Sequence, residues 1–251
     1  MDENDGGSID AVLEALADGD ITLEEARDRV RGVRWIGEYA RIDPRQGART
    51  GIPEIVYGAR KADDVMIGIG GEMLAGAGHA ILTDVTESVR DELTQRADSA
   101  TFHEGSQTLV ISSEAYEPPE ERGTVGVVTA GSSDIPIAEE AVILAEEMGC
   151  RVETVYDVGV SAIHRLFNER LRLDGCDVVV VGAGREGALA TVVAGMVSCP
   201  VIGLPIGTGR GAGGDGEAAL LGMLQSCTFL TVVNIDAGFV AGGQAALIAR
   251  G

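Results

Sequence analysis

The segment Asp177-Val-Val-Val-Val-Gly-Ala-Gly-Arg-Glu-Gly187 shows most clearly how this chain folds. Its continuous run of β-branched residues predicts a strand that is buried on both faces, as in a parallel sheet. The glycines that follow predict a tight turn into a helix. Their spacing is that of G-x-G-x-x-G, but they follow the third strand of the pattern and not the first. Dinucleotide binding therefore cannot be inferred from this segment alone.

Strands and helices alternate on both sides of this segment. Similar apolar runs predict strands at residues 124–129, 152–156, 200–204 and 231–235. Helical patterns follow them at residues 135–148, 162–172, 187–197, 217–226 and 242–249. This alternation predicts right-handed βαβ units in an α/β, three-layer α/β/α domain with a parallel sheet, which we expect to span residues 123–251.

The first half of the chain is less regular. Residues 8–33 predict a helical hairpin, whose second helix opens with the capping box Thr22-Leu-Glu-Glu25. We expect irregular chain over residues 35–58, then a helix over 61–74 and short strands at 80–82 and 108–112. The segment Glu117-Pro-Pro-Glu-Glu121 predicts a linker. A smaller, mainly helical α+β region over residues 1–116 should therefore precede the parallel-sheet domain.

Charge and composition narrow the function classes. The 251 residues carry a formal net charge of −21, and Lys61 is the only lysine. Nucleic-acid binding is not expected, because it needs clustered basic residues. Strong acidity with almost no lysine suggests a salt-rich cytosol, in which hydrated carboxylates keep the surface soluble.

The sequence also indicates a cytoplasmic protein. No apolar stretch is long enough to cross a membrane, and the acidic start lacks the features of a signal peptide. The four cysteines are widely spaced, with no C-x-x-C pair, so neither a disulfide framework nor a zinc site is expected.

In parallel sheets, ligands bind beyond the carboxyl ends of the strands. The first such end is Gly131-Ser-Ser-Asp134, where backbone N–H groups, Ser132 and Ser133 suit a phosphate. Ser133 or Asp134 can equally cap the following helix, and one loop can do both. At the second end, Asp157 precedes His164 and Arg165, which open the next helix. His164 can be either a structural residue or a catalytic one.

The third strand end carries Gly182, Gly184 and Glu186. Glu186 can be a partner of the helix dipole or a general base. The fourth end, residues 205–216, holds six glycines together with Thr208 and Arg210. Core packing does not explain so many glycines, so we expect close approach to a ligand or a mobile lid. From position alone, Cys227 at a helix end is a small buried residue.

The segment from Thr124 to Arg250 resembles the N5-carboxyaminoimidazole ribonucleotide mutase (PurE) family. The stretches that carry the resemblance are Gly131-Ser-Ser-Asp134, Ile163-His-Arg165, Val179-Val-Val-Gly-Ala-Gly184 and Pro200-Val-Ile-Gly-Leu-Pro205. The resemblance implies a flavodoxin-like fold, a homo-oligomer (an octamer in that family) and nucleotide phosphate on the serine loop. However, Ala188 stands where PurE enzymes carry a proton-transferring histidine.

Where the sequence differs from PurE, it resembles a related family, the pyridinium-3,5-biscarboxylic acid mononucleotide synthases (LarB). Its pattern is matched by Asp157-Val-Gly-Val-Ser-Ala-Ile-His-Arg-Leu166, Glu186-Gly-Ala-Leu189, Ser226-Cys227 and Asn234-Ile-Asp236-Ala-Gly-Phe239. In the first half, Arg49-Thr-Gly-Ile-Pro-Glu-Ile-Val-Tyr-Gly58 also matches, so the resemblance covers nearly the whole chain.

The LarB resemblance implies carboxylation of nicotinic acid adenine dinucleotide at ring C5 and hydrolysis of its phosphoanhydride. The product would serve nickel-pincer nucleotide biosynthesis and lactate racemase maturation. Cys227 becomes the expected nucleophile, with Cys199 as the alternative, and Glu186 becomes the base. Asp157 and His164 would assist hydrolysis. Substrate contacts are expected from Ser132, Ser133, Asp134, Arg165, Gly182, Gly184, Thr208, Arg210, Asn234 and Arg49.

CO2 or bicarbonate is the expected co-substrate, and no covalently bound cofactor is expected, while a Mg²⁺ requirement stays open. Two other functions stay open as well: an aminoimidazole ribonucleotide carboxylase or mutase, and a nucleotide sensor without catalysis.

Overall fold

The structure is a computed structural model that describes residues 9–23, 26–27, 30, 34–36, 40–43 and 46–251. The chain divides into two compact units. One consists of residues 1–103 and 107–116, and the other of residues 104–106 and 117–251. The division along the chain falls beside the proline-containing segment at residues 117–121.

The C-terminal unit contains a five-stranded parallel sheet. In spatial order its strands are β11 (Thr231–Val232), β10 (Val201–Pro205), β9 (Val178–Ala183), β7 (Thr124–Thr129) and β8 (Arg151–Val155). The first strand along the chain therefore lies between the second and the third, which is the strand order of flavodoxin-like folds. The predicted three-layer α/β fold is confirmed.

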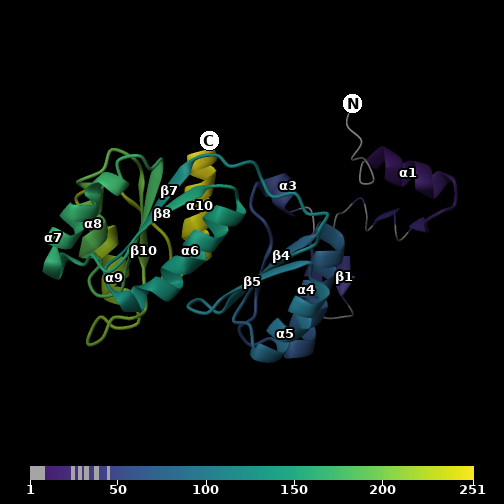
Figure 1. Cartoon of the computed structure of the whole chain (residues 1–251), viewed down its shortest axis with the longest axis horizontal. Helices are drawn as coiled ribbons and strands as arrows, with labels where there is room; N and C mark the ends of the chain where they lie inside the picture. Colours follow the sequence, from purple (N-terminus) through teal and green to yellow (C-terminus); the bar gives the residue numbers. More distant parts are fainter. Residues whose placement is uncertain (1–8, 24–25, 28–29, 31–33, 37–39, 44–45) are drawn as a thin grey trace. The chain divides into compact units, whose positions relative to one another are not determined.

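Helices cover both faces of this sheet (Figure 1). One face carries α6 (Ile135–Glu147) and α10 (Gly238–Arg250). The other carries α7 (His164–Glu169), α8 (Ala188–Ala194) and α9 (Glu217–Leu224). The helix predicted over residues 162–172 is instead divided into short 3-10 turns before and after α7, namely η2 (Val160–Ala162) and η3 (Arg170–Arg172).

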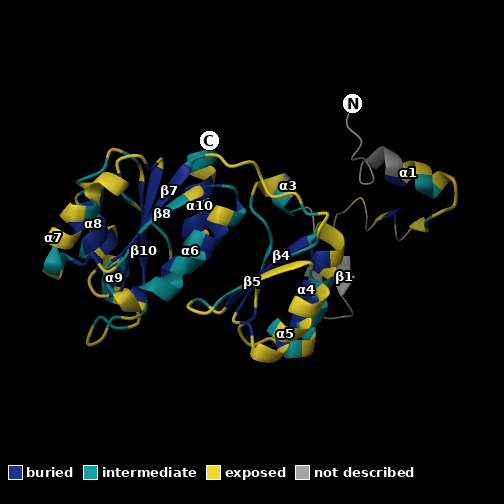
Figure 2. Cartoon of the chain, in the orientation of Figure 1, coloured by how far each residue is buried: buried dark blue, intermediate teal, exposed yellow. Residues whose placement is uncertain are grey.

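Burial explains why the strand sequences lack alternation. Every residue of β7 and β9 is buried, because helices cover both faces of these central strands (Figure 2). Each fully buried valine contributes roughly 1.5–3 kcal/mol relative to an exposed one. Helices α6 and α10 pack closely because Gly242 has no side chain: a methyl group there would lie 2.5 Å from the main-chain oxygen of Ala141.

The N-terminal unit is built around a four-stranded mixed sheet. Its strands, in spatial order, are β3 (Ile55–Tyr57), β4 (His79–Thr83), β6 (Thr108–Ser112) and β5 (Ser99–His103). Its longer helices are α4 (Asp63–Ala77) and α5 (Glu87–Arg96). Helix α4 ends where Gly78 takes a left-handed conformation, with φ of 70°, which glycine adopts without steric cost.

The unit holds more regular structure than its sequence predicted. Residues 35–58 are not irregular: they include β1 (Arg34–Ile36) paired with β2 (Ala40–Ile42), α3 (Gln46–Thr50) and β3. The first predicted hairpin helix is confirmed as α1 (Ile9–Ala17). Much of the second, including Glu25 of the capping box, lies outside the described residues.

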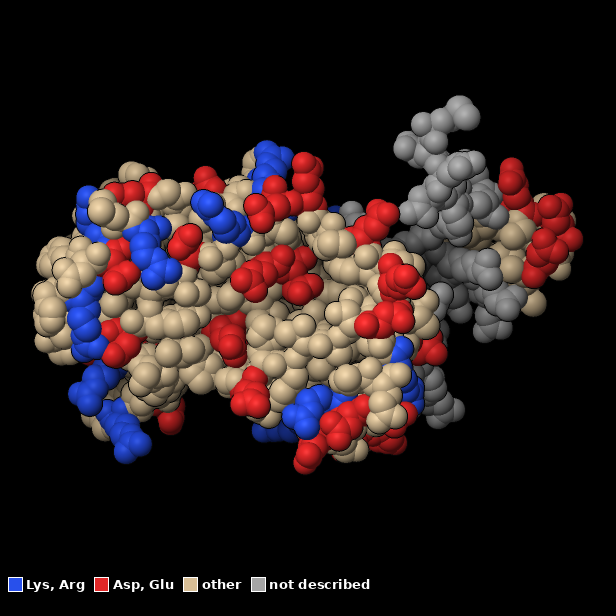
Figure 3. Space-filling view, viewed as in Figure 1, with Lys and Arg blue, Asp and Glu red and all other residues tan. Residues whose placement is uncertain are grey.

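Acidic side chains are spread over the visible surfaces of both units, whereas basic ones are fewer (Figure 3). Within the part of the chain that the structure describes, no helix combines the length and apolar character needed to cross a bilayer. The figure agrees with the formal charge of −21.

Candidate functional site

The first loop at the carboxyl edge of the parallel sheet is organised around Asp134. Its side chain is 4% exposed. One carboxylate oxygen accepts the N–H of Gly131 at 2.9 Å, and the other accepts the hydroxyl of Thr208 at 2.7 Å. The backbone of Gly184 lies close to the same carboxylate and favours its charged form. Asp134 therefore joins the loops that follow β7, β9 and β10.

Burial raises the pKa of the Asp134 carboxyl group above its ordinary value, and the hydrogen bonds from Thr208 and Gly131 and the backbone of Gly184 oppose that rise. Hydrogen bonds from Gly131 and Thr208 engage both carboxylate oxygens, so Asp134 holds these loops in place. Ser132 and Ser133 are exposed beside it. Their expected contact with a phosphate stays a prediction.

A second aspartate, Asp236, holds the start of the glycine-rich loop. Its carboxylate accepts the N–H of Gly207 at 2.7 Å, and its own N–H donates to the carbonyl of Pro205 at 2.9 Å. Our site prediction missed Asp236, although the stretch Asn234-Ile-Asp236 was part of the family pattern. Asn234 itself accepts the N–H of Ile235 at 2.9 Å and is exposed.

Close packing explains several glycines that we had assigned to ligand approach or a lid. A methyl group on Gly184 would collide with the hydroxyl of Thr208 and lie 2.9 Å from a carboxylate oxygen of Asp134. One on Gly182 would lie 2.9 Å from Ile206. Gly207, Gly209, Gly213 and Gly216 in the next loop likewise have neighbours too close for a side chain. Packing therefore accounts for four of the six glycines in residues 205–216, and the expectation that it would not was wrong for these four, whereas Gly211 has no neighbour within 4 Å.

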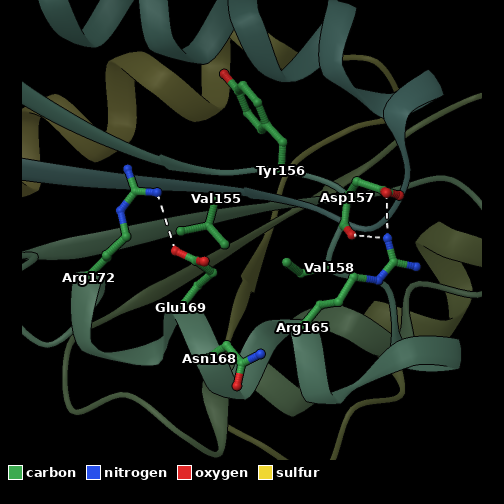
Figure 4. A pocket seen from close by; sticks show the side chains of 8 residues that line it. All are labelled: Val155, Tyr156, Asp157, Val158, Arg165, Asn168, Glu169 and Arg172. Atoms are coloured by element: carbon green, nitrogen blue, oxygen red, sulfur yellow. Dashed lines mark hydrogen bonds and ion pairs between the residues drawn. The ribbon is translucent and has the colours of Figure 1, made fainter.

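The loop after β8 contains a more accessible carboxylate. Asp157 forms an ion pair with Arg165, whose Nη1 also donates to the Asp157 carbonyl at 2.7 Å (Figure 4). The N–H of Asp157 donates to the hydroxyl of Thr129 at 3.1 Å. His164 is exposed and is the first residue of α7. The structure thus brings Asp157, His164 and Arg165 to one strand end, as the sequence predicted from their spacing.

A cavity of about 340 Å³ opens beside this ion pair. Its walls come from the end of β8 and from the facing side of α7 and η3. Arg172 lies at the other end, with its Nη1 3.4 Å from a Glu169 carboxylate oxygen. The sequence did not predict this cavity, because it depends on how α7 packs against β8.

Glu186 and Cys227 lie on the face of the sheet that α8 and α9 cover. Glu186 is exposed just before α8, and its main-chain oxygen lies so close to Gly222 of α9 that a methyl group at Gly222 would collide with it. Cys227 follows Gly222 by five residues, which limits their separation to about 18 Å even in a fully extended chain.

A hydrogen bond of 2.9 Å from Thr191 of α8 to Ser226 holds the residue next to Cys227 against α8. Both predicted reactive groups are therefore attached to the same pair of helices. Their proposed roles stay predictions.

Exposure separates Cys227 from the other cysteines. Cys227 is exposed, whereas Cys150 and Cys176 are buried and Cys199 is intermediate. Burial raises the pKa of the Cys199 thiol, and it raises the pKa of Cys176 to about 11. A higher pKa leaves less thiolate, which is the nucleophilic form. Position alone had suggested a buried role for Cys227, and that expectation was wrong.

Two further residues, Arg210 and Arg49, were predicted to contact the substrate. Arg210 is exposed in the glycine-rich loop. In the N-terminal unit, Arg49 pairs with Asp43 at 2.6 Å, and Glu54 accepts the N–H of Asp43 at 2.8 Å. Burial raises the pKa of Glu54, and the nearby Asp43 carboxylate adds to that rise. Among the described residues no cluster of three or more His, Cys, Asp and Glu side chains could hold a metal ion.

Comparison with known families matches both units. Residues 124–250 match the AIR carboxylase family, and residues 34–114 match the LarB/PurE-like N-terminal domain. The fold and strand-end loops thus define the C-terminal unit as a PurE-like domain of the AIR carboxylase class. Because a LarB-type domain precedes it, the chain belongs to the LarB family.

Individual relatives support the same placement. An uncharacterised protein of Methanocaldococcus jannaschii is 40% identical over 98% of each chain. The N5-carboxyaminoimidazole ribonucleotide mutase of Mycobacterium tuberculosis is 30% identical, over 53% of this chain and 74% of the mutase. That of Pyrococcus horikoshii is 26% identical, over 51% of this chain and 68% of the mutase. These matches support a PurE-related carboxylase or mutase.

Proposed function

We propose that this protein converts nicotinic acid adenine dinucleotide, CO2 and water to pyridinium-3,5-biscarboxylic acid mononucleotide and AMP, for nickel-pincer nucleotide biosynthesis. The pairing of a LarB-type N-terminal domain with a PurE-like domain supports this reaction. The observation that carries the proposal is the exposed thiol of Cys227, attached to the same helix pair as the exposed carboxylate of Glu186.

The reaction needs a nucleophile because a pyridinium ring is too electron-poor to attack CO2. In the proposed first step the Cys227 thiolate adds to the ring and forms a C–S bond. The electron pair of the ring double bond then makes C5 an enamine carbon, which attacks CO2 and forms a C–C bond. A thiolate suits this role because it is nucleophilic and can leave again later.

Glu186 is the proposed base for the second step. It accepts the proton from C5, the C–S bond breaks, and the electron pair restores the aromatic ring while the thiolate leaves. The exposed position of Glu186 before α8 leaves its carboxylate accessible to a substrate. The net change is replacement of the C5 hydrogen by a carboxylate.

The third step is hydrolysis of the phosphoanhydride. A water molecule attacks phosphorus and AMP leaves. Asp157 and His164 would orient that water, with Arg165 and Arg210 countering the charge of the phosphates. Ser132 and Ser133 would hold the phosphate of the mononucleotide half at the first strand end.

A second candidate is a carboxylase or mutase reaction on aminoimidazole ribonucleotide, which the similarity to N5-carboxyaminoimidazole ribonucleotide mutases favours. Ala188, at the position where PurE enzymes carry a proton-transferring histidine, counts against it.

One experiment separates these functions. The protein is mixed with ¹³C-bicarbonate and, in separate reactions, with nicotinic acid adenine dinucleotide or with aminoimidazole ribonucleotide, and the products are identified by mass spectrometry. We expect AMP and a labelled dicarboxylated mononucleotide. Label in an aminoimidazole ribonucleotide product instead would support the second candidate, and no label with either substrate would indicate a nucleotide sensor.

A further inference from the structure

The cavity beside α7 has a polar wall with helical spacing. Arg165, Asn168, Glu169 and Arg172 all line it. Residues three, four and seven positions apart lie on one side of a helix, so these side chains form a single stripe that faces β8. The function proposed above uses Arg165 alone among them.

The opposite wall is apolar. Val155 and Val158 at the end of β8 are 2% and 3% exposed and line the same cavity. Figure 4 shows them between the Asp157–Arg165 pair and the Glu169–Arg172 pair, with Asn168 on α7 below them and the ring of Tyr156 directed away. Because both valines are almost fully buried, the accessible lining of the cavity is mainly polar.

The cavity also offers cationic groups in an acidic chain. Three of the eight arginines between residues 117 and 251 lie on α7 and η3 (Arg165, Arg170 and Arg172). Arg165 uses only Nη1 in its two contacts with Asp157, so within the described structure Nη2 and Nε remain for a ligand. Phosphate oxygens are the acceptors that a guanidinium binds best.

We propose that this cavity binds the adenosine monophosphate half of the dinucleotide substrate, an inference that rests on the proposed function. The phosphate lies at Arg165, next to the carboxyl edge where hydrolysis is placed. The ribose hydroxyls donate to Glu169, a role that carboxylates fill in other nucleotide sites.

The adenine ring then lies beneath the guanidinium plane of Arg172. The Asn168 amide pairs with the ring edge, because its donor and acceptor match N6 and N7 of adenine. Along the helix, Arg165 and Arg172 are about 10 Å apart, which accommodates an extended nucleoside monophosphate.

Equilibrium dialysis of the full chain with radiolabelled AMP tests this assignment. We expect Asn168→Ala and Arg172→Ala each to weaken AMP binding about tenfold, the effect of losing one good polar or stacking contact. Arg170→Ala is the matched control: Arg170 loses the same charge on the same segment, pairs with Asp174 at 3.5 Å and does not line the cavity. The Arg170→Ala variant should bind AMP with the affinity of the wild type.

Glu169→Gln sharpens the test through the ribose. The wild type should prefer AMP over 2′-deoxy-AMP by about fivefold, and this preference should fall toward one in the variant. Photolabelling of the wild type with 8-azido-AMP requires no variant: the label should map to residues 151–172. Label elsewhere, or AMP affinity unchanged in both alanine variants, would overturn the subsite.

The subsite and the proposed function can fail separately. If the wild type makes no dicarboxylated product but AMP binding still depends on Asn168 and Arg172, the proposed reaction is wrong and the subsite stands. If the product forms and the photolabel maps outside the β8–α7 segment, the subsite is wrong and the reaction stands.

Discussion

Two neighbouring loops of the parallel sheet each place an aspartate beyond a strand end, yet the two carboxylates do different work. Asp134, after β7, is buried and accepts hydrogen bonds from Gly131 and Thr208. Asp157, after β8, is about half exposed and pairs with Arg165. One carboxylate holds the site together, and the other is available to a ligand. Position at the ligand edge does not by itself identify a functional residue; burial and partners do.

The cysteines show the same contrast. Cys176 is buried beside the sheet with a pKa raised to about 11, whereas Cys227 is exposed after α9. Substituting the exposed residues, Asp157 and Cys227, should therefore change the reaction rate. Substituting the buried residues, Asp134 and Cys176, should change the free energy of unfolding.

The largest expected effect is on Cys227. Cys227→Ala should lower the rate of carboxylation by at least about a thousandfold, because the ring would lose its nucleophile. Product formation measured by mass spectrometry checks this, with thermal unfolding as the test of folding. Cys199→Ala is the control and should keep near-normal turnover. A fully active Cys227→Ala variant would exclude the covalent step.

Glu186→Gln should lower turnover by about a hundredfold, since the amide cannot accept the C5 proton. Initial rates at saturating substrate measure the effect. Glu217→Gln removes the same charge from an exposed position at the start of α9 and should have little effect. Equal rates for the two variants would show that Glu186 is not the base.

Asp134→Ala should lower the free energy of unfolding by about 1–3 kcal/mol, because Gly131 and Thr208 lose their shared acceptor. Chemical denaturation measures the change. A variant as stable as the wild type would contradict the role of Asp134 in joining the three loops.

The raised pKa of Asp134 gives this residue a pH signature. Because the folded state holds the proton more tightly than the unfolded state, the associated stabilisation is present below the ordinary pKa of 3.8 and is lost as pH rises through the raised pKa. Asp134→Asn should remove this slope. The difference in unfolding free energy between wild type and variant, followed upward from pH 3.8, tests the sign.

The smallest effect is expected at Asp157. Asp157→Asn should change the free energy of unfolding by about 0.5 kcal/mol or less, because its ion pair with Arg165 is about half exposed. Hydrolysis to AMP should nevertheless slow. A large loss of stability would place Asp157 with Asp134 as a structural residue and would remove the contrast between the two loops.

The parallel sheet could be predicted from sequence because its strands are continuous apolar runs. Strands β7 and β6 have the predicted bounds, and β8 to β10 differ by one or two residues at each end. The N-terminal unit was harder. In β5, Ser99–His103, no residue is buried, and α5 buries only Val89 and Leu93. Neither segment therefore shows the regular spacing of apolar residues that identifies a strand or a helix in a sequence.

The candidate site was only partly predictable. Spacing placed Asp157, His164 and Arg165 between the end of β8 and the first turn of α7, and the structure pairs Asp157 with Arg165 there. Sequence could not show that the carboxylate of Asp134 is fully engaged, since its partner Thr208 is 74 residues away. It also could not separate Cys227 from Cys199 by exposure, which depends on tertiary packing.

The central claim is that the Cys227 thiol bonds to the substrate ring. Intact-protein and peptide mass spectrometry of Glu186→Gln, quenched after mixing with nicotinic acid adenine dinucleotide and bicarbonate, tests it most directly. With proton removal blocked, we predict a substrate adduct on the peptide that contains Cys227. An unmodified Cys227 in an enzyme that still forms product would contradict the claim.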